Sequence, residues 1–158
     1  MYELLKLLEK NARLSLEELA AMLGRTEAQV AQAMDDYEKA GILRGYTSVV
    51  DWEKTERDIV TARIEVQVTP KKDRGFDELA ETISQYKEVQ SLYLMSGGYD
   101  LALTLVGRSF KEIASFVAYR LAPLDGVQST ATHFVLRKYK EKNIILLDTP
   151  KDERGVML

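Results

Sequence analysis

The first 50 residues of this 158-residue chain carry apolar side chains at the spacing of α-helices. Leucines at positions 4, 5, 7 and 8, with charged residues among them, predict an amphipathic helix from Tyr2 to Lys10. The segment LEELAAML predicts a second helix over residues 16–23. A third helix begins after Thr26 and presents an apolar face at steps of four, three and four residues: Val30, Met34, Tyr37 and Gly41.

Polar residues mark where these helices start and stop. Ser15 is followed three residues later by Glu18, and Thr26 by Gln29, so each pair can form a capping box that satisfies two backbone N–H groups. Gly24 can adopt the left-handed conformation that closes a helix. Two short helices joined by a turn of three or four residues, behind a supporting helix, are typical of the helix-turn-helix. Small three-helix units also serve as scaffolds or dimerisation domains.

The spacing of apolar side chains along the chain changes beyond residue 58. Residues 59–68 alternate apolar and polar side chains, as a strand does. The pattern then predicts a helix in 75–86, strands in 88–97 and 99–107, a helix from 110 to about 121 and a strand in 126–140. Gly97 and Gly98 favour a tight hairpin turn between the two middle strands. This order is the ferredoxin-like plan of four antiparallel strands with two helices on one face.

Apolar residues occupy successive positions in the two middle strands, so we expect apolar groups on both faces of this central hairpin. Two helices can cover only one face. The simplest cover for the other face is the same sheet of a second copy, because large exposed apolar patches mark association surfaces. The pattern therefore predicts an obligate homodimer, with the segment NIILL, residues 143–147, as an edge strand across the contact.

The predicted fold class is α+β: an N-terminal all-α helix-turn-helix domain followed by a ferredoxin-like βαββαβ antiparallel sandwich. The first domain comprises residues 1–50 and the second residues 59–147. Between them, residues 51–58 form a run of charges that is typical of a linker. Residues 44–50, RGYTSVV, include β-branched and aromatic side chains and predict a short strand before the linker. Residues 148–158 are polar and predict a flexible tail.

Composition narrows the possible functions. The chain has no cysteine, a single histidine and neither a Gly-rich phosphate loop nor a metal-ligand spacing, so we expect no enzyme activity, no cofactor and no metal. His133 lies on a predicted strand and is expected to be a packed or interfacial histidine. No apolar run is long enough to span a bilayer and the N-terminus lacks signal-peptide features, which predicts a cytoplasmic protein without membrane contact.

Several segments in this order resemble the Lrp/AsnC family of bacterial and archaeal transcriptional regulators. They are Arg13, GILRGYT at 41–47, SGGYDL at 96–101 and GVQSTATHFVL at 126–136, and the resemblance spans roughly residues 2–142. It implies a winged or simple helix-turn-helix that binds operators in double-stranded DNA. It also implies a C-terminal module that assembles homodimers into tetramers or octamers.

The resemblance further implies that an amino acid or similar small-molecule effector binds between subunits. Matched residue by residue, the effector-binding positions are Ser96, Gly97, Gly98, Tyr99, Asp100, Thr130 and Thr132. Asp100 suits an α-ammonium group, and the neighbouring glycine N–H groups suit an α-carboxylate. The same residues also have a purely structural interpretation, in which the glycines make the turn and Asp100 bonds to it.

The third helix departs from the family pattern. It carries Ala33, Asp35 and Asp36 where family members commonly have Arg or Lys, and residues 1–50 hold six basic against eight acidic residues, a net charge of −2. DNA binding must therefore come from a local set of residues, because the whole chain, at −3, does not attract a polyanion. We expect that set to be Arg13, Arg25, Thr26, Ala28, Gln29, Gln32 and Arg44.

Gln29 and Gln32 can each read an adenine edge bidentately, and the arginines can hold the phosphate backbone. The carboxylates of Asp35 and Asp36 on the same helix repel the phosphates and so oppose DNA binding. The alternative function is an oligomeric small-molecule sensor or protein-interaction module whose acidic helix-turn-helix does not bind DNA.

Overall fold

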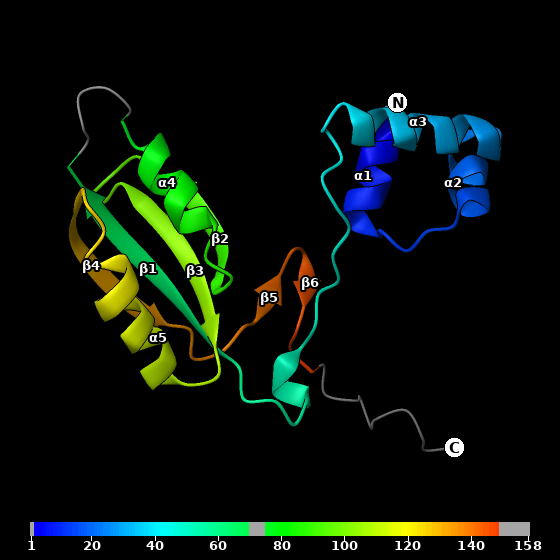
Figure 1. The fold of residues 1–158 in the computed structure, drawn as a ribbon. Coiled ribbons are helices and arrows are strands. Elements are labelled where there is room, and N and C mark those ends of the chain that lie inside the picture. The colour runs from blue at the N-terminus through cyan, green and yellow to red at the C-terminus, as the bar shows by residue number, and fades with distance from the viewer. Residues whose placement is uncertain (1, 70–74, 149–158) are drawn as a thin grey trace, which may run out of the picture. The chain divides into compact units, whose positions relative to one another are not determined.

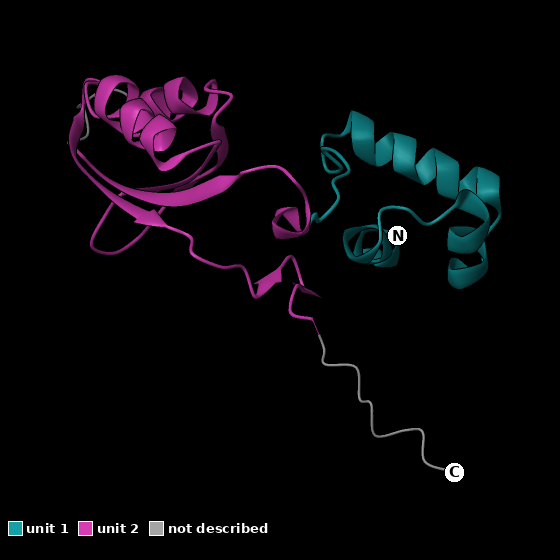
Figure 2. Ribbon diagram, turned by 90° about the horizontal axis from the view of Figure 1, so that it is seen from below, with its two compact units in different colours: residues 1–50 teal, residues 51–158 magenta. Residues whose placement is uncertain are grey.

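The computed structural model describes residues 2–69 and 75–148. It divides into two compact units, residues 1–50 and 51–158 (Figure 2). Apart from Asp148, the expected flexible tail lies outside the described residues. In the described part of the chain, no helix has the length and apolarity needed to cross a membrane.

The N-terminal unit contains the three predicted helices (Figure 1): α1, Tyr2–Lys10; α2, Leu16–Leu23; and α3, Glu27–Lys39. Both predicted capping boxes form. The side chains of Ser15 and Thr26 accept from the backbone N–H three residues on, and the side chains of Glu18 and Gln29 accept from the backbone N–H of Ser15 and Thr26. The helices enclose one apolar core of Leu4, Leu8, Leu19, Ala20, Val30 and Ala33.

Gly24 closes α2 in the left-handed conformation, with φ 61° and ψ 40°. A Cβ at this position would meet no atom within 4 Å, so an alanine would be opposed by its backbone conformation rather than by a clash. We expect Gly24→Ala to lower the free energy of unfolding by about 1 kcal/mol in urea titrations followed by circular dichroism. Gly45→Ala is the matched control, because Gly45 has equal space and no positive φ. Equal stability of the two variants would contradict this account.

The second unit follows the predicted order (Figure 1). Its elements are β1, Val60–Val68; α4, Asp77–Ser84; β2, Val89–Leu94; β3, Leu101–Gly107; α5, Phe110–Phe116, continued by a π-helical turn over Val117–Leu121; and β4, Val127–Phe134. The antiparallel sheet has the strand order β2-β3-β1-β4. Both helices lie on one face of it, which confirms the ferredoxin-like prediction.

Apolar groups of the central hairpin lie on both faces of the sheet, as predicted, but its leucines share one face. Leu92 pairs with Leu103, and Leu94 with Leu101, so these side chains share the face of Ile64, beneath the helices. The opposite face carries a mixture of polar and apolar groups: Thr61, Arg63, Glu65, Tyr93, Ala102, Thr104, Val106, Ala131 and His133. The strands alternate over most of their length, with irregularities at Gln67/Val68 and at Val89/Ser91. The pairing register between strands, which alternation alone does not fix, places all the leucines together.

One of three connecting segments contradicts the prediction, and the other two show detail that the sequence did not indicate. Residues 44–50 form no strand, because a β-rich segment needs a pairing partner. The charged linker contains a 3₁₀ helix, Trp52–Lys54, capped by Asp51. In the NIILL segment, β6, Ile144–Ile145, pairs with β5, Lys140–Glu141, of its own chain, and its pairing across a subunit contact stays a prediction. The side chains of this small hairpin are largely exposed, Ile145 by 68%.

Candidate DNA-reading helix and effector site

All seven residues expected to contact DNA are exposed in the N-terminal unit. Thr26, Ala28, Gln29 and Gln32 lie at the start of α3, the end of a recognition helix that contacts bases. Arg25 stands in the turn before them and Arg13 lies between α1 and α2. Arg44 follows α3, and its guanidinium lies so close to Gly41 that a Cβ there would be 3.1 Å from Nη2. Gly41 itself has a φ of 67°.

The outward residues of α3 are bonded to one another. Gln29 Oε1 accepts from the backbone N–H of Thr26 at 3.1 Å, and Gln32 Nε2 donates to Asp36 Oδ1 at 2.9 Å. Each glutamine therefore has one end of its amide occupied, which leaves neither free for the expected bidentate contact unless its bond breaks. Lys39 donates to Asp35, and this hydrogen bond raises the pKa of Lys39 above its ordinary value.

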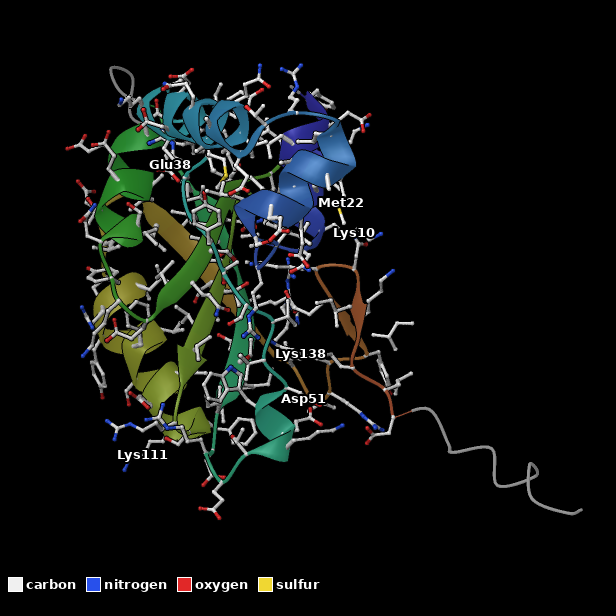
Figure 3. The ribbon with its side chains drawn as sticks, turned by 90° about the vertical axis from the view of Figure 1, so that its right-hand side faces the viewer. Lys10, Met22, Glu38, Asp51, Lys111 and Lys138 are labelled. Carbon is white, nitrogen blue, oxygen red and sulfur yellow. The ribbon has the colours of Figure 1, made fainter. Side chains whose placement is uncertain are left out.

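Two features of this unit were not predicted from the sequence. Ala33 is only 2% exposed and belongs to the core, so it is not an outward position from which a basic residue is missing. Tyr46 Oη donates at 2.8 Å to Glu38, which is labelled on α3 in Figure 3. Partial burial, and then this hydrogen bond, raise the pKa of Tyr46. The eight-residue separation gave no periodic signal from which this contact could be found.

The expected effector residues of the central hairpin form a wider loop than the predicted tight turn. Met95 N–H donates to the carbonyl of Asp100 at 2.8 Å, so Ser96, Gly97, Gly98 and Tyr99 lie between the two strand ends. Ser96 and both glycines are exposed, whereas Tyr99 is half-buried.

Asp100 is half-buried and is tied to β1 rather than to the turn. Its Oδ2 accepts from the backbone N–H of Val68 at 2.7 Å, and its own N–H donates to the carbonyl of Val66 at 3.0 Å. One carboxylate oxygen is thus used by the fold. A second bond fixes the loop from the other face, since Gln67 Nε2 donates to the carbonyl of Gly98 at 3.1 Å.

Ser129 of β4 donates to Gln67 Oε1 at 2.8 Å, so one hydrogen-bonded chain joins β4, β1 and the loop. Gln67 and Ser129 were not predicted as site residues, because their meeting depends on sheet register. Thr130 pairs with Val66 and Thr132 with Ile64, which places both threonines on the helix-covered face. The structure therefore brings Asp100 and Thr130 to either side of Val66, and leaves Thr132 one pair further along the strand.

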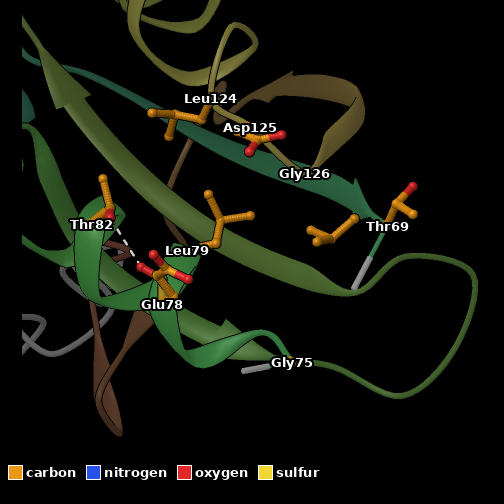
Figure 4. A pocket seen from close by; sticks show the side chains of 9 residues that line it. Thr69, Gly75, Glu78, Leu79, Thr82, Leu124, Asp125 and Gly126 are labelled. Carbon is orange, nitrogen blue, oxygen red and sulfur yellow. Dashed lines mark hydrogen bonds between the residues drawn. The ribbon is translucent and has the colours of Figure 1, made fainter. Parts of the chain in front are cut away.

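A hollow of about 190 Å³ lies on the helix side of this end of the sheet (Figure 4). Val68, whose N–H donates to Asp100, is also one of the residues that line this hollow. Thr82 of α4 donates to the carbonyl of Glu78 beside it at 3.0 Å. Its lining combines apolar side chains, hydroxyls and two carboxylates: Val68, Thr69, Gly75, Glu78, Leu79, Thr82, Leu124, Asp125 and Gly126.

His133 lies on the face of the sheet that carries no helix, with Nε2 3.5 Å from Glu65 Oε2. Its side chain is 59% exposed, so of the two expected roles, packed or interfacial, the first does not hold within its own chain. Across residues 2–69 and 75–148, no group of three histidine or acidic side chains is placed to hold a metal ion.

A helix-turn-helix followed by a ferredoxin-like domain defines a class of transcriptional regulators, and comparison with known proteins identifies the family. A model described as the Lrp/AsnC ligand binding domain matches residues 61–145, and one described as a winged helix-turn-helix DNA-binding domain matches residues 2–44. The chain belongs to the Lrp/AsnC family of helix-turn-helix transcriptional regulators.

Similar proteins cover almost the whole chain. YugG of Bacillus subtilis, described as an uncharacterised HTH-type transcriptional regulator, is 41% identical over 99% of this chain and 94% of its own. LrpA of Pyrococcus horikoshii, an HTH-type transcriptional regulator, is 29% identical over 87% of this chain and 94% of its own. A transcriptional regulator from Neisseria meningitidis, solved in complex with L-Met, is 26% identical, with a TM-score of 0.70 over 87% of this chain and 88% of that one.

Proposed function

We propose that this regulator binds operator DNA as a homodimer and that an amino acid or related metabolite, bound between subunits at the 96–100 loop, controls the binding. The observation that carries the proposal is the loop itself. It exposes two glycines beside the half-buried Asp100 at the edge of a family-typical ligand-binding domain. The related regulator from Neisseria meningitidis, solved with L-Met, supports an amino acid as the effector.

Two features favour a second copy as the partner of the ferredoxin-like unit. The face opposite the helices carries Arg63 and Glu65 two residues apart on β1, so a two-fold axis can set each against its opposite in the other copy. The hairpin of β5 and β6 exposes Ile144 and Ile145 although it is only two residue pairs long, a size that is marginal without packing. Assembly beyond the dimer, to tetramers or octamers, belongs to the same proposal, as does a cytoplasmic location beside the DNA.

The test is fluorescence anisotropy of a labelled duplex from the region upstream of the gene, at low salt, with a panel of amino acids. We expect binding whose affinity changes by about fivefold or more with at least one amino acid, the usual size of allosteric coupling. Asp100→Asn is the sharpest variant, because an amide oxygen still accepts from Val68 N–H while the negative charge is gone. DNA binding should persist, and the amino-acid concentration needed for the response should rise about tenfold or more.

Absence of DNA binding, with or without amino acids, would favour the sensor or interaction module without an operator. A full response at unchanged concentrations in Asp100→Asn would contradict the role of this carboxylate.

A further inference from the structure

The amide of Gln29 has a fixed orientation at the start of α3. The backbone N–H of Thr26 can only donate, so the Gln29 atom that lies 3.1 Å from it is Oε1. The capping box holds the side chain in place, because Gln29 N–H also donates to Thr26 Oγ1. The two N–H groups of Gln29 Nε2 are left for a partner outside the helix.

The amide of Gln32 has the opposite orientation. The ionised carboxylate of Asp36 can only accept, so the Gln32 atom that lies 2.9 Å from it is Nε2. Oε1 of Gln32 remains as an acceptor. Gln29 and Gln32 are three residues apart, which makes them neighbours on one exposed face of the helix.

We infer that α3 reads the major groove with a donor from Gln29 and an acceptor from Gln32, and that Asp36 is the positioning residue that sets the specificity of Gln32. The inference rests on the proposed DNA binding. In the major groove, adenine and cytosine present an exocyclic amino donor, whereas guanine and thymine present only acceptors and a methyl group. A Gln32 held by Asp36 therefore selects a base with an amino group, and Gln29 selects an acceptor beside it. The neighbouring carboxylate, Asp35, has no part in this, since it pairs with Lys39.

The test is selection of binding sites from a pool of random duplexes by the full chain at low salt, followed by sequencing. The parent should favour adenine or cytosine over guanine or thymine by about tenfold at one position of each half-site. In Asp36→Ala the freed amide can turn to present either end, so this ratio should fall toward one. Asp35→Ala removes the same charge from the same helix and should retain the ratio. Asp36→Asn can meet Gln32 with either its oxygen or its NH₂ group, so it no longer fixes the Gln32 amide and the ratio should fall in this variant as well.

Both alanine variants should bind the unselected pool more tightly than the parent, because each removes a carboxylate that opposes the phosphates. An unchanged ratio in Asp36→Ala, or an equal loss in Asp35→Ala, overturns the role of Asp36. Binding of DNA with no base preference in the parent overturns this inference and leaves the proposed function standing. If none of the four proteins retains DNA, the proposed function fails, and this inference fails with it.

Discussion

Raising the salt concentration from about 50 mM to about 200 mM should weaken DNA binding by about a thousandfold. Arg13, Arg25 and Arg44 are the exposed arginines of the N-terminal unit, which gives six in a homodimer. Each phosphate that they neutralise contributes a slope of about −0.9 to the logarithm of affinity against the logarithm of salt, so the dimer should show a slope of about −5. The net charge of −2 on residues 1–50 leaves little attraction to replace these contacts when they are screened.

Anisotropy titrations at a series of salt concentrations measure this slope. Arg25→Ala should reduce its magnitude by about 2 per dimer, since each subunit loses one phosphate contact. Arg108→Ala is the matched control, because Arg108 is an exposed arginine of the other unit, just before α5. A slope near zero in the parent, or the same reduction in Arg108→Ala, would be incompatible with phosphate contacts by the helix-turn-helix arginines.

Replacing Leu103 by alanine should lower the free energy of unfolding of the ferredoxin-like unit by about 3 kcal/mol. Leu103 is 1% exposed at the centre of β3, where it pairs with Ile64 on one side and Leu92 on the other beneath the helices. The loss combines the transfer free energy of the missing carbons with the cavity that they leave. Urea titration followed by circular dichroism measures the change.

Leu94→Ala provides the comparison for this experiment. Leu94 is a leucine of the same face, paired with Leu101, but it is 61% exposed at the end of β2. Its replacement should cost less than about 1 kcal/mol, because surface substitutions leave little cavity. Similar losses for the two variants would show that burial does not set the stability of this sheet.

The elements predicted well from the sequence are those whose signals are local. Each helix start is indicated by a pair of residues within four positions, Ser15 with Glu18 and Thr26 with Gln29, and both capping boxes form in the structure. The order of strands and helices in the second unit also follows from local periodicity. The face on which Leu92 and Leu94 lie relative to Leu103 depends on the pairing register between β2 and β3, which the pattern of the sequence did not fix.

The candidate sites divide in the same way. The residues nominated for DNA contact are exposed, as outward positions of a periodic helix should be. Ala33 was misplaced because its short side chain gives no periodic signal, although it is buried. The bond from Val68 to Asp100 joins residues 32 positions apart, and the contact of Gln67 with Ser129 joins residues 62 apart. Contacts between residues so far apart leave no periodic signal in the sequence from which they could be predicted.

Gly41 has two structural roles. Its positive φ ends the third helix, and its missing side chain leaves the space in which the guanidinium of Arg44 lies. A substitution of Gly41 would disturb both roles at once. The end of the third helix and the position of the Arg44 guanidinium are therefore coupled, so a substitution at Gly41 cannot change one without the other.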